Sequence, residues 1–161
     1  ATPSASRLAC AFPLSAKHNR LRRKAKAAGA KVIIDADSYD SSVMENLDLI
    51  DAFVASEFVY DVLFKNKNYE ENCRKVFEMG PPVVVFTLGA KGCVGYSAEG
   101  FFQLDSYNVH VADTVGAGDV FHGAFAVGMV EGGSALAAYA TPQALRALLE
   151  APGNPRVLEL G

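Results

Sequence analysis

Cysteine is scarce in this chain, which has 3 among its 161 residues. Cys10, Cys73 and Cys93 are far apart, and none has the Cys-x-x-Cys spacing of zinc sites or dithiol redox centres. An odd and scattered set of cysteines indicates reduced thiols rather than a disulfide framework. We therefore expect a cytoplasmic protein.

Long apolar runs and a strong excess of one charge are also absent. No apolar run is long enough to span a bilayer, and residues 1–14 lack the apolar core of a secretory signal. The formal net charge of −3 argues against general affinity for nucleic acid, so neither a membrane nor a nucleic acid is an expected partner. One basic cluster is interpreted as a solvated helix face: Lys17, Arg20, Arg22, Arg23, Lys24, Lys26 and Lys31.

The composition and the pattern of the chain predict one globular domain, residues 1–161, with a layered α/β fold. Half of the residues are hydrophobic and 20% are charged. Strands alternate with helices, which favours a mainly parallel sheet flanked by helices. The expected strands are 31–35, 49–55, 83–87, 93–97, 101–104 and 107–111, and the expected helices are 15–28, 41–47, 56–65, 69–79, 117–131, 134–139 and 142–150.

The stretch Asp113-Thr114-Val115-Gly116-Ala117-Gly118-Asp119 is the most informative motif. Its glycines lie where a polar loop turns into an apolar helix, so several N–H groups point at one spot, at the positive end of a helix dipole. This arrangement binds anions, yet a carboxylate beside it repels phosphate. The combination makes sense if Asp119 takes a proton from a hydroxyl that attacks the phosphate.

This stretch resembles the C-terminal signature of the PfkB/ribokinase family of carbohydrate and nucleoside kinases, Asp-Thr-x-Gly-Ala-Gly-Asp-x-Phe-x-Gly-Ala, and every fixed position is filled. The resemblance implies a ribokinase-like, Rossmann-type layered fold. It also implies that Asp119 is the catalytic base and that Gly116, Ala117 and Gly118 form an anion hole for the transferred phosphoryl group. The alternative is a plain helix start in which Asp119 only complements the dipole.

A second motif, Thr87-Leu88-Gly89-Ala90-Lys91-Gly92, follows the apolar strand 83–87. Two glycines let the backbone approach a ligand closely, and a threonine hydroxyl can bond a phosphate. The motif resembles the Thr-x-Gly-x-x-Gly segment that lies along the nucleotide in the same family, which implies that Thr87, Gly89 and Gly92 bind nucleotide. By itself it is equally well a connection between two strands.

Polar residues that follow the expected strands could face one crevice, because ligands bind beyond the carboxyl ends of parallel strands. Asp35 and Asp37 resemble the family's Asp-x-Asn segment and could help to organise Mg²⁺, or could simply form a turn. The stretch Ser56-Glu57-Phe58-Val59 lacks both fixed residues of the family's Asn-x-x-Glu motif, and Ser56 is better interpreted as a helix N-cap. The resemblance also implies a monovalent cation near Asp113, which could equally cap the following turn.

Other residues of the signature helix are interpreted as packing residues. His122 lies three residues after Asp119, but its position is not fixed in the family's pattern, so packing or hydrogen bonding is favoured over catalysis. Phe121, Phe125 and Met129 follow helical spacing and are expected in the core.

The resemblance implies an ATP-dependent sugar kinase that uses Mg²⁺ and acts on a small sugar or sugar-like substrate. Family members are roughly twice as long, so the chain matches their C-terminal half, without the sugar-binding half and its lid. The chain does not begin with Met, and we expect a fragment or a processed form, whose uncovered apolar surface could form a homo-oligomer. The alternative is a non-catalytic relative that binds nucleotide or a partner. A Rossmann dinucleotide enzyme is disfavoured, since no Gly-x-Gly-x-x-Gly follows the first expected strand.

Overall fold

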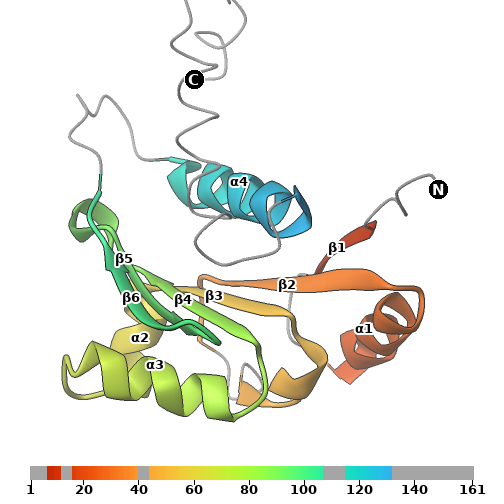
Figure 1. Cartoon of the computed structure of the whole chain (residues 1–161), viewed down its shortest axis with the longest axis horizontal. Coiled ribbons are helices and arrows are strands. Elements are labelled where there is room, and N and C mark those ends of the chain that lie inside the picture. The colour runs from red at the N-terminus through yellow and green to blue at the C-terminus, as the bar shows by residue number, and fades with distance from the viewer. Residues whose placement is uncertain (1–6, 12–15, 40–43, 107–114, 132–161) are drawn as a thin grey trace, which may run out of the picture. The chain divides into compact units, whose positions relative to one another are not determined.

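The strands of the sheet lie side by side in the order that they have in the chain. The computed structural model describes residues 7–11, 16–39, 44–106 and 115–131. Its 6-stranded sheet has the order β1-β2-β3-β4-β5-β6 (Figure 1). The strands are β1 (Arg7–Ala11), β2 (Ala30–Ala36), β3 (Ala52–Ser56), β4 (Val83–Thr87), β5 (Cys93–Ser97) and β6 (Gly100–Leu104).

The connections between the strands explain their directions. Helix α1 (Ala16–Ala27) connects β1 to β2, and α2 (Glu57–Leu63) and α3 (Tyr69–Glu78) connect β3 to β4, so these pairs are parallel. A parallel pair needs such a crossover, whereas an antiparallel pair needs only a short turn. Short turns join β4 to β5 and β5 to β6, and the two strands of each of these pairs are antiparallel. The predicted α/β fold, with a mainly parallel sheet and flanking helices, is confirmed.

One face of the sheet packs against α2 and α3, which lie together below it in Figure 1. Side chains alternate between the two faces of a strand, and those of this face belong to one buried cluster. Tyr60 of α2 is the largest fully buried side chain, and its ring centroid is 5.0 Å from that of Phe86, edge to face. Aromatic rings favour this geometry. The packing holds the start of α2 at the carboxyl ends of the strands. Residues of the sheet in this cluster are Ile34, Ala36, Phe53, Ala55, Val84, Phe86 and Val94.

The chain divides into two compact units, residues 1–111 and 112–161. The sheet belongs to the first unit, and helix α4 (Ala117–Glu131) to the second. The expectation of one domain over residues 1–161 stays a prediction. On α4, Phe125 and Met129 are 1% and 6% exposed, as expected for core residues, whereas Phe121, expected there too, is only half-buried. No helix of the described ranges is long and apolar enough to cross a membrane.

Several expected boundaries differ from those observed. Strand β1 has no counterpart among the expected strands, although Leu8 to Ala11 are apolar or small. Strand β3 begins at Ala52 rather than at Leu49, because Leu49 closes the 3₁₀ turn η2 (Leu47–Leu49). The expected helix 41–47 lies partly outside the described residues. The expected strand 107–111 and the expected helices 134–139 and 142–150 lie outside them entirely.

The basic cluster is a solvated face in part only. Arg20, Arg23 and Lys24 are exposed on α1, as expected. Arg22 is 2% exposed, so its assignment to the solvated face is wrong. Its Nη1 donates to Asn19 Oδ1 at 2.7 Å, and burial lowers the pKa of the guanidinium. Helix α1 packs against the sheet, and at this position of the helix the side chain faces inward.

The thiols of Cys73 and Cys93 are expected to resist chemical labelling in the folded chain. Their side chains are 0% and 2% exposed, and burial raises the pKa of each thiol to about 12. Only the thiolate reacts. In a Cys10→Ser variant, a thiol reagent at mildly alkaline pH should label both sites rapidly in urea and neither site in the native state. Fast labelling without denaturant would show that the interface of α3 with β5 opens readily.

Candidate active site

The signature leads into α4 as predicted, and its first glycine shapes the turn. Gly116 has a φ of 78°, a backbone conformation in which a residue with a side chain would be strained. Its carbonyl accepts a hydrogen bond from the Val120 N–H at 3.0 Å. The N–H groups of the first turn of a helix have no carbonyl acceptor within that helix. In α4 these groups belong to Gly116, the residue before the helix, and to Ala117, Gly118 and Asp119.

The surface of this turn is open. A Cβ atom added at Gly116 or Gly118 would meet nothing within 4 Å. Ala117, Gly118 and Asp119 are exposed. First-turn amides and the helix dipole together attract an anion, and the open backbone gives it room to approach. The Asp119 carboxylate can act as a base beside that anion, and it also complements the dipole, so the turn is compatible with both roles.

Polar residues of three neighbouring strands share one face of the sheet. Ser56 pairs with Thr87, and Asp35 pairs with Val54, two residues before Ser56. Paired residues face the same way, and the orientation repeats every two residues, so Asp35, Ser56 and Thr87 lie on the same face. That face is opposite to the one packed against α2 and α3. These three residues lie near the carboxyl ends of their strands, and the expectation that they face one crevice stays a prediction.

The loop after β4 combines one open glycine with one that is tightly packed. A Cβ added at Gly89, where φ is 58°, would meet nothing within 4 Å. A Cβ added at Gly92 would lie 1.9 Å from the Leu104 carbonyl oxygen, so packing against β6 already requires glycine there. Thr87 Oγ1 donates to the Ala55 carbonyl at 3.4 Å. Of the two glycines, Gly89 is the one that a ligand can approach.

The start of α2 differs in part from the expected cap. Ser56 occupies the N-cap position, as predicted, but its side chain makes no capping hydrogen bond. Its Oγ is buried, and no partner for it lies in the part of the chain that the structure describes. Glu57, in the first turn, accepts a hydrogen bond through Oε1 from Lys91 Nζ at 2.8 Å and lies 3.6 Å from Lys67 Nζ. The carboxylate of Glu57 is therefore engaged by two lysines.

Metal ligands are less defined than the anion site. Asp35 is half-buried and Asp37, directly after β2, is exposed. Among the side chains of residues 19–39, 44–106 and 115–129, no three His, Cys, Asp or Glu gather closely enough to hold a metal ion. Two carboxylates would need water or ligand oxygens to complete a Mg²⁺ shell. Asp113, the candidate for a monovalent cation, lies outside the described residues.

The ring of His122 lies beside that of Phe121, its neighbour in the chain. It is half-buried, and its ring centroid lies 6.1 Å from that of Phe121. Phe121 in turn stacks on Phe125, with centroids 6.0 Å apart. These contacts agree with the packing interpretation of His122.

Sequence reasoning missed the residues that anchor the glycine loop. Lys91 occupies a variable position of its motif, and its partner Glu57 lies 34 residues earlier. Ser106 Oγ donates to the Ala90 carbonyl at 2.5 Å. Neither contact leaves a local pattern in the sequence, because both depend on the approach of distant segments.

Comparison with known proteins gives consistent matches. A model of the pfkB family of carbohydrate kinases matches residues 11–148. A ribokinase of Lactococcus lactis is 30% identical over 106 residues, 66% of this chain and 34% of that enzyme. A protein named ribokinase II from Escherichia coli, solved with ATP and Mg²⁺, is 27% identical with a TM-score of 0.57, covering 66% of this chain and 38% of that one. A fructokinase from Vibrio cholerae, bound to fructose, ADP and calcium, has a TM-score of 0.68 at 22% identity, covering 86% and 52%.

The matched part is only a share of each relative, from 34% of the Lactococcus enzyme to 52% of the Vibrio structure. Within this chain, however, the family model extends over most of the residues and includes both glycine motifs. The shared fold over the sheet and its helices agrees with it. The chain belongs to the pfkB family of carbohydrate kinases.

Proposed function

We propose that this chain is the nucleotide-binding part of an ATP-dependent kinase that phosphorylates a hydroxyl of a small sugar or sugar-like molecule. The observation that carries the proposal is the turn before α4, where open first-turn amides lie beside the Asp119 carboxylate. The names of two solved relatives support it, since one is bound to ATP and Mg²⁺ and the other to fructose and ADP.

In this proposal the turn supplies both the base and the anion site. Asp119 takes the proton from the attacking hydroxyl, which raises the nucleophilicity of the oxygen. The amides of Gly116, Ala117 and Gly118 stabilise the charge that develops on the phosphoryl oxygens. Both groups belong to one turn of one helix, so their relative geometry is fixed by the helix itself.

The loop at the carboxyl edge of the sheet is a second part of the chain that we propose to contact nucleotide. The open side of Gly89 allows phosphate to approach the backbone, and the Thr87 hydroxyl could turn its hydrogen from the Ala55 carbonyl, at 3.4 Å, to a phosphate oxygen. Gly92 acts indirectly, because it allows the loop to lie against β6.

Carboxylates at the same edge fit a role in organising Mg²⁺. This ion keeps several waters and is usually bound through one or two carboxylates and the phosphates of the substrate. Asp35 and Asp37 offer such a pair, half-buried and exposed respectively. Bound Mg²⁺ would neutralise charge on the phosphates. A monovalent cation near Asp113 and a cytoplasmic location belong to the same proposal.

A non-catalytic nucleotide-binding relative is the second candidate, and the state of Glu57 favours it. In this chain that carboxylate is occupied by Lys91 and Lys67, and Ser56 offers no carboxylate or amide to a metal. The Mg²⁺ shell would then depend on few protein oxygens. Sugar-dependent release of ADP separates the two candidates, since only a kinase shows it.

Gly118→Val tests the proposed phosphate contact. The new side chain enters open space, and Gly118 is not among the residues with positive φ, so we expect the turn to remain unstrained. Valine would, however, occupy the path of the phosphate to the backbone. An NMR titration with ATP detects even weak binding. In it we expect the affinity to fall about tenfold or more, which corresponds to the loss of one charge-assisted hydrogen bond.

Gly123→Val is the matched control, because an added Cβ at Gly123 of the same helix also meets nothing within 4 Å. It should leave the affinity for ATP unchanged. Equal ATP affinity in a folded Gly118→Val variant would mean that the turn does not hold phosphate.

A further inference from the structure

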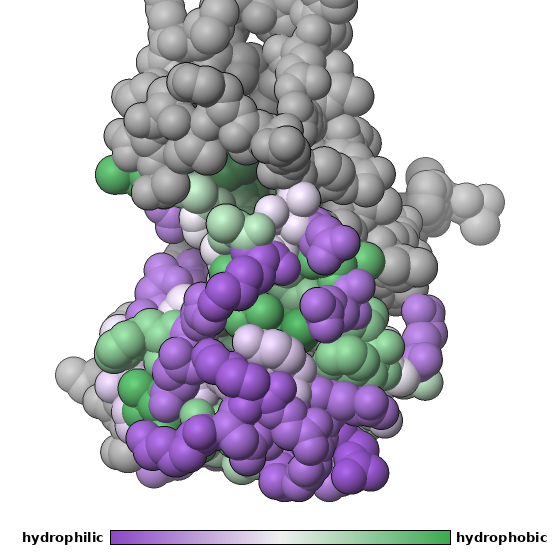
Figure 2. Space-filling model, turned by 90° about the vertical axis from the view of Figure 1, so that its left-hand side faces the viewer, coloured by the Kyte–Doolittle hydropathy of each residue, from purple (hydrophilic) through white to green (hydrophobic). Residues whose placement is uncertain are grey.

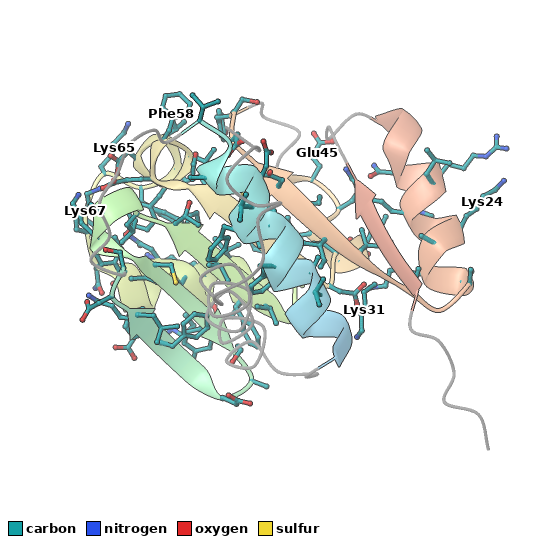
Figure 3. All side chains as sticks on the ribbon, turned by 90° about the horizontal axis from the view of Figure 1, so that it is seen from above. Lys24, Lys31, Glu45, Phe58, Lys65 and Lys67 are labelled. Atoms are coloured by element: carbon teal, nitrogen blue, oxygen red, sulfur yellow. The ribbon has the colours of Figure 1, made fainter. Side chains whose placement is uncertain are left out.

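One carboxylate joins three segments of the first unit at the carboxyl edge of the sheet. Glu57, at the start of α2, accepts a hydrogen bond from Lys91 at 2.8 Å and lies 3.6 Å from Lys67 Nζ. Lys91 ends the 3₁₀ turn η3 (Gly89–Lys91), and Lys67 lies in the loop between α2 and α3. Lys65 and Lys67 project on one side of the molecule together with Phe58 of α2 (Figure 3).

This ionic contact is connected to the hydrophobic core. Lys67 Nζ lies 5.2 Å from the ring centroid of the fully buried Tyr60. Lys67 also forms an ion pair with Asp61. Asn72 Nδ2 donates to Tyr60 Oη at 2.8 Å and to Asn66 Oδ1 at 3.0 Å, which holds the loop before Lys67. Figure 2 shows the side of the molecule that is on the left in Figure 1, and hydrophilic side chains gather over the lower part of that face. The position of Glu57 is thus defined by residues packed in the core.

Side chains hold the outer side of the glycine loop at two points, since Lys91 contacts Glu57 and Ser106 Oγ donates to the Ala90 carbonyl. Its base is fixed, since Leu88 N–H donates to the Gly92 carbonyl at 2.8 Å and Gly92 packs against β6. Its outer part consists of Gly89, Ala90 and Lys91, all of them exposed. Glycine gives a loop many accessible conformations. Lys91 is the side chain of this outer part that reaches another element, through Glu57.

We propose that Glu57 is a positioning residue that holds the loop 87–92 in its nucleotide-binding shape through Lys91, an inference that rests on the proposed function. The carboxylate neutralises Lys91, which is then kept as an anchor rather than offered to phosphate. The hydrogen bond from Lys91 forms at the N-terminus of α2, where a carboxylate is also favoured by the helix dipole. The hydrogen bond to Glu57 is the main cause that raises the pKa of Lys91.

Hydrogen exchange tests the positioning role without any ligand. The amides of Lys91 and Gly92 donate to the Leu88 and Gly89 carbonyls at 3.2 Å and 3.0 Å, so their exchange reports on the shape of the loop. Exposed ion pairs are weak, and we expect Glu57→Gln to speed the exchange of both amides about three- to fivefold. Lys91→Met should do the same, and the double variant should add nothing further, because both changes remove one interaction.

Glu71→Gln is the matched control. Glu71 forms an ion pair of 2.7 Å with Lys75 on α3, with exposure similar to that of Glu57, and neither residue belongs to the loop. Exchange at Lys91 and Gly92 should stay at the wild-type rate. Unchanged exchange in Glu57→Gln, or an equal change in Glu71→Gln, would overturn the positioning role.

An ATP titration by NMR supplies the second measurement. We expect Glu57→Gln to weaken ATP binding about three- to fivefold, with the melting temperature close to that of Glu71→Gln. Wild-type affinity in Glu57→Gln would overturn the inference. If the wild-type chain binds no ATP, the proposed function fails, and the positioning of the loop is still decided by the exchange rates.

Discussion

Replacing Asp119 by asparagine is expected to lower kcat about a thousandfold or more in any form of the protein that transfers phosphate. Asparagine keeps the size of the side chain but cannot accept the proton of the attacking hydroxyl. The affinity for ATP should remain similar, because the first-turn amides of α4 are unchanged. Initial rates of ADP release, together with an ATP titration, measure both effects.

The same substitution separates the two roles that a carboxylate can have at this turn. If Asp119 only complements the helix dipole, Asp119→Asn should lower stability by less than about 1 kcal/mol and leave kcat unchanged. Glu99→Gln, an exposed carboxylate in the turn between β5 and β6, is the control and should leave both quantities unchanged. Normal turnover of folded Asp119→Asn would exclude the assignment of this residue as the base.

No sugar-dependent phosphorylation is expected from the 161 residues alone. A kinase must exclude water from the transferred phosphoryl group, or ATP is hydrolysed instead. The chain corresponds to 34% to 52% of the length of the relatives described above, and we propose that the substrate site and the segment that closes over it lie outside it. ATP binding by the isolated chain should accordingly be weak.

The assay is release of ADP with a panel of ketoses, aldoses and nucleosides. It compares two proteins: the 161 residues alone, and a longer form in which the sequence upstream of them is also present. Only the longer protein should show sugar-dependent turnover, and Asp119→Asn in it is the inactive control. Light scattering should show self-association of the shorter form, because apolar surface is left uncovered. Robust turnover by the isolated chain would mean that residues not identified above form the substrate site.

Local patterns in the sequence predicted the parts of the fold that depend on neighbouring residues. Strand β4 is a run of β-branched residues and a phenylalanine between a Gly-Pro break and a glycine loop, and it was predicted with its observed bounds. The start of α4 at Ala117 followed from the change from glycine turn to apolar run. The shared face of Asp35, Ser56 and Thr87 follows from the parallel register of β2, β3 and β4.

Features that depend on distant segments could not be predicted in the same way. Strand β1 has 5 residues and none of them is β-branched, so its sequence does not indicate a strand. Its strand conformation comes from pairing with β2. Burial of Arg22 depends on how α1 packs against the sheet. The contact of Glu57 with Lys91 joins residues 34 positions apart, and Gly92 is required by a carbonyl of β6. Such requirements arise from tertiary packing, which overrides local preference.

A ribosome delivers β1 to β6 in the order in which they pair. Every ladder of the sheet joins consecutive strands, so each strand that emerges finds its neighbour already synthesised. Contacts between segments close in sequence form quickly, and chains fold from the N-terminus as they are made. The described sheet can therefore grow by one strand at a time during translation, because each strand from β2 to β6 pairs with the strand made just before it.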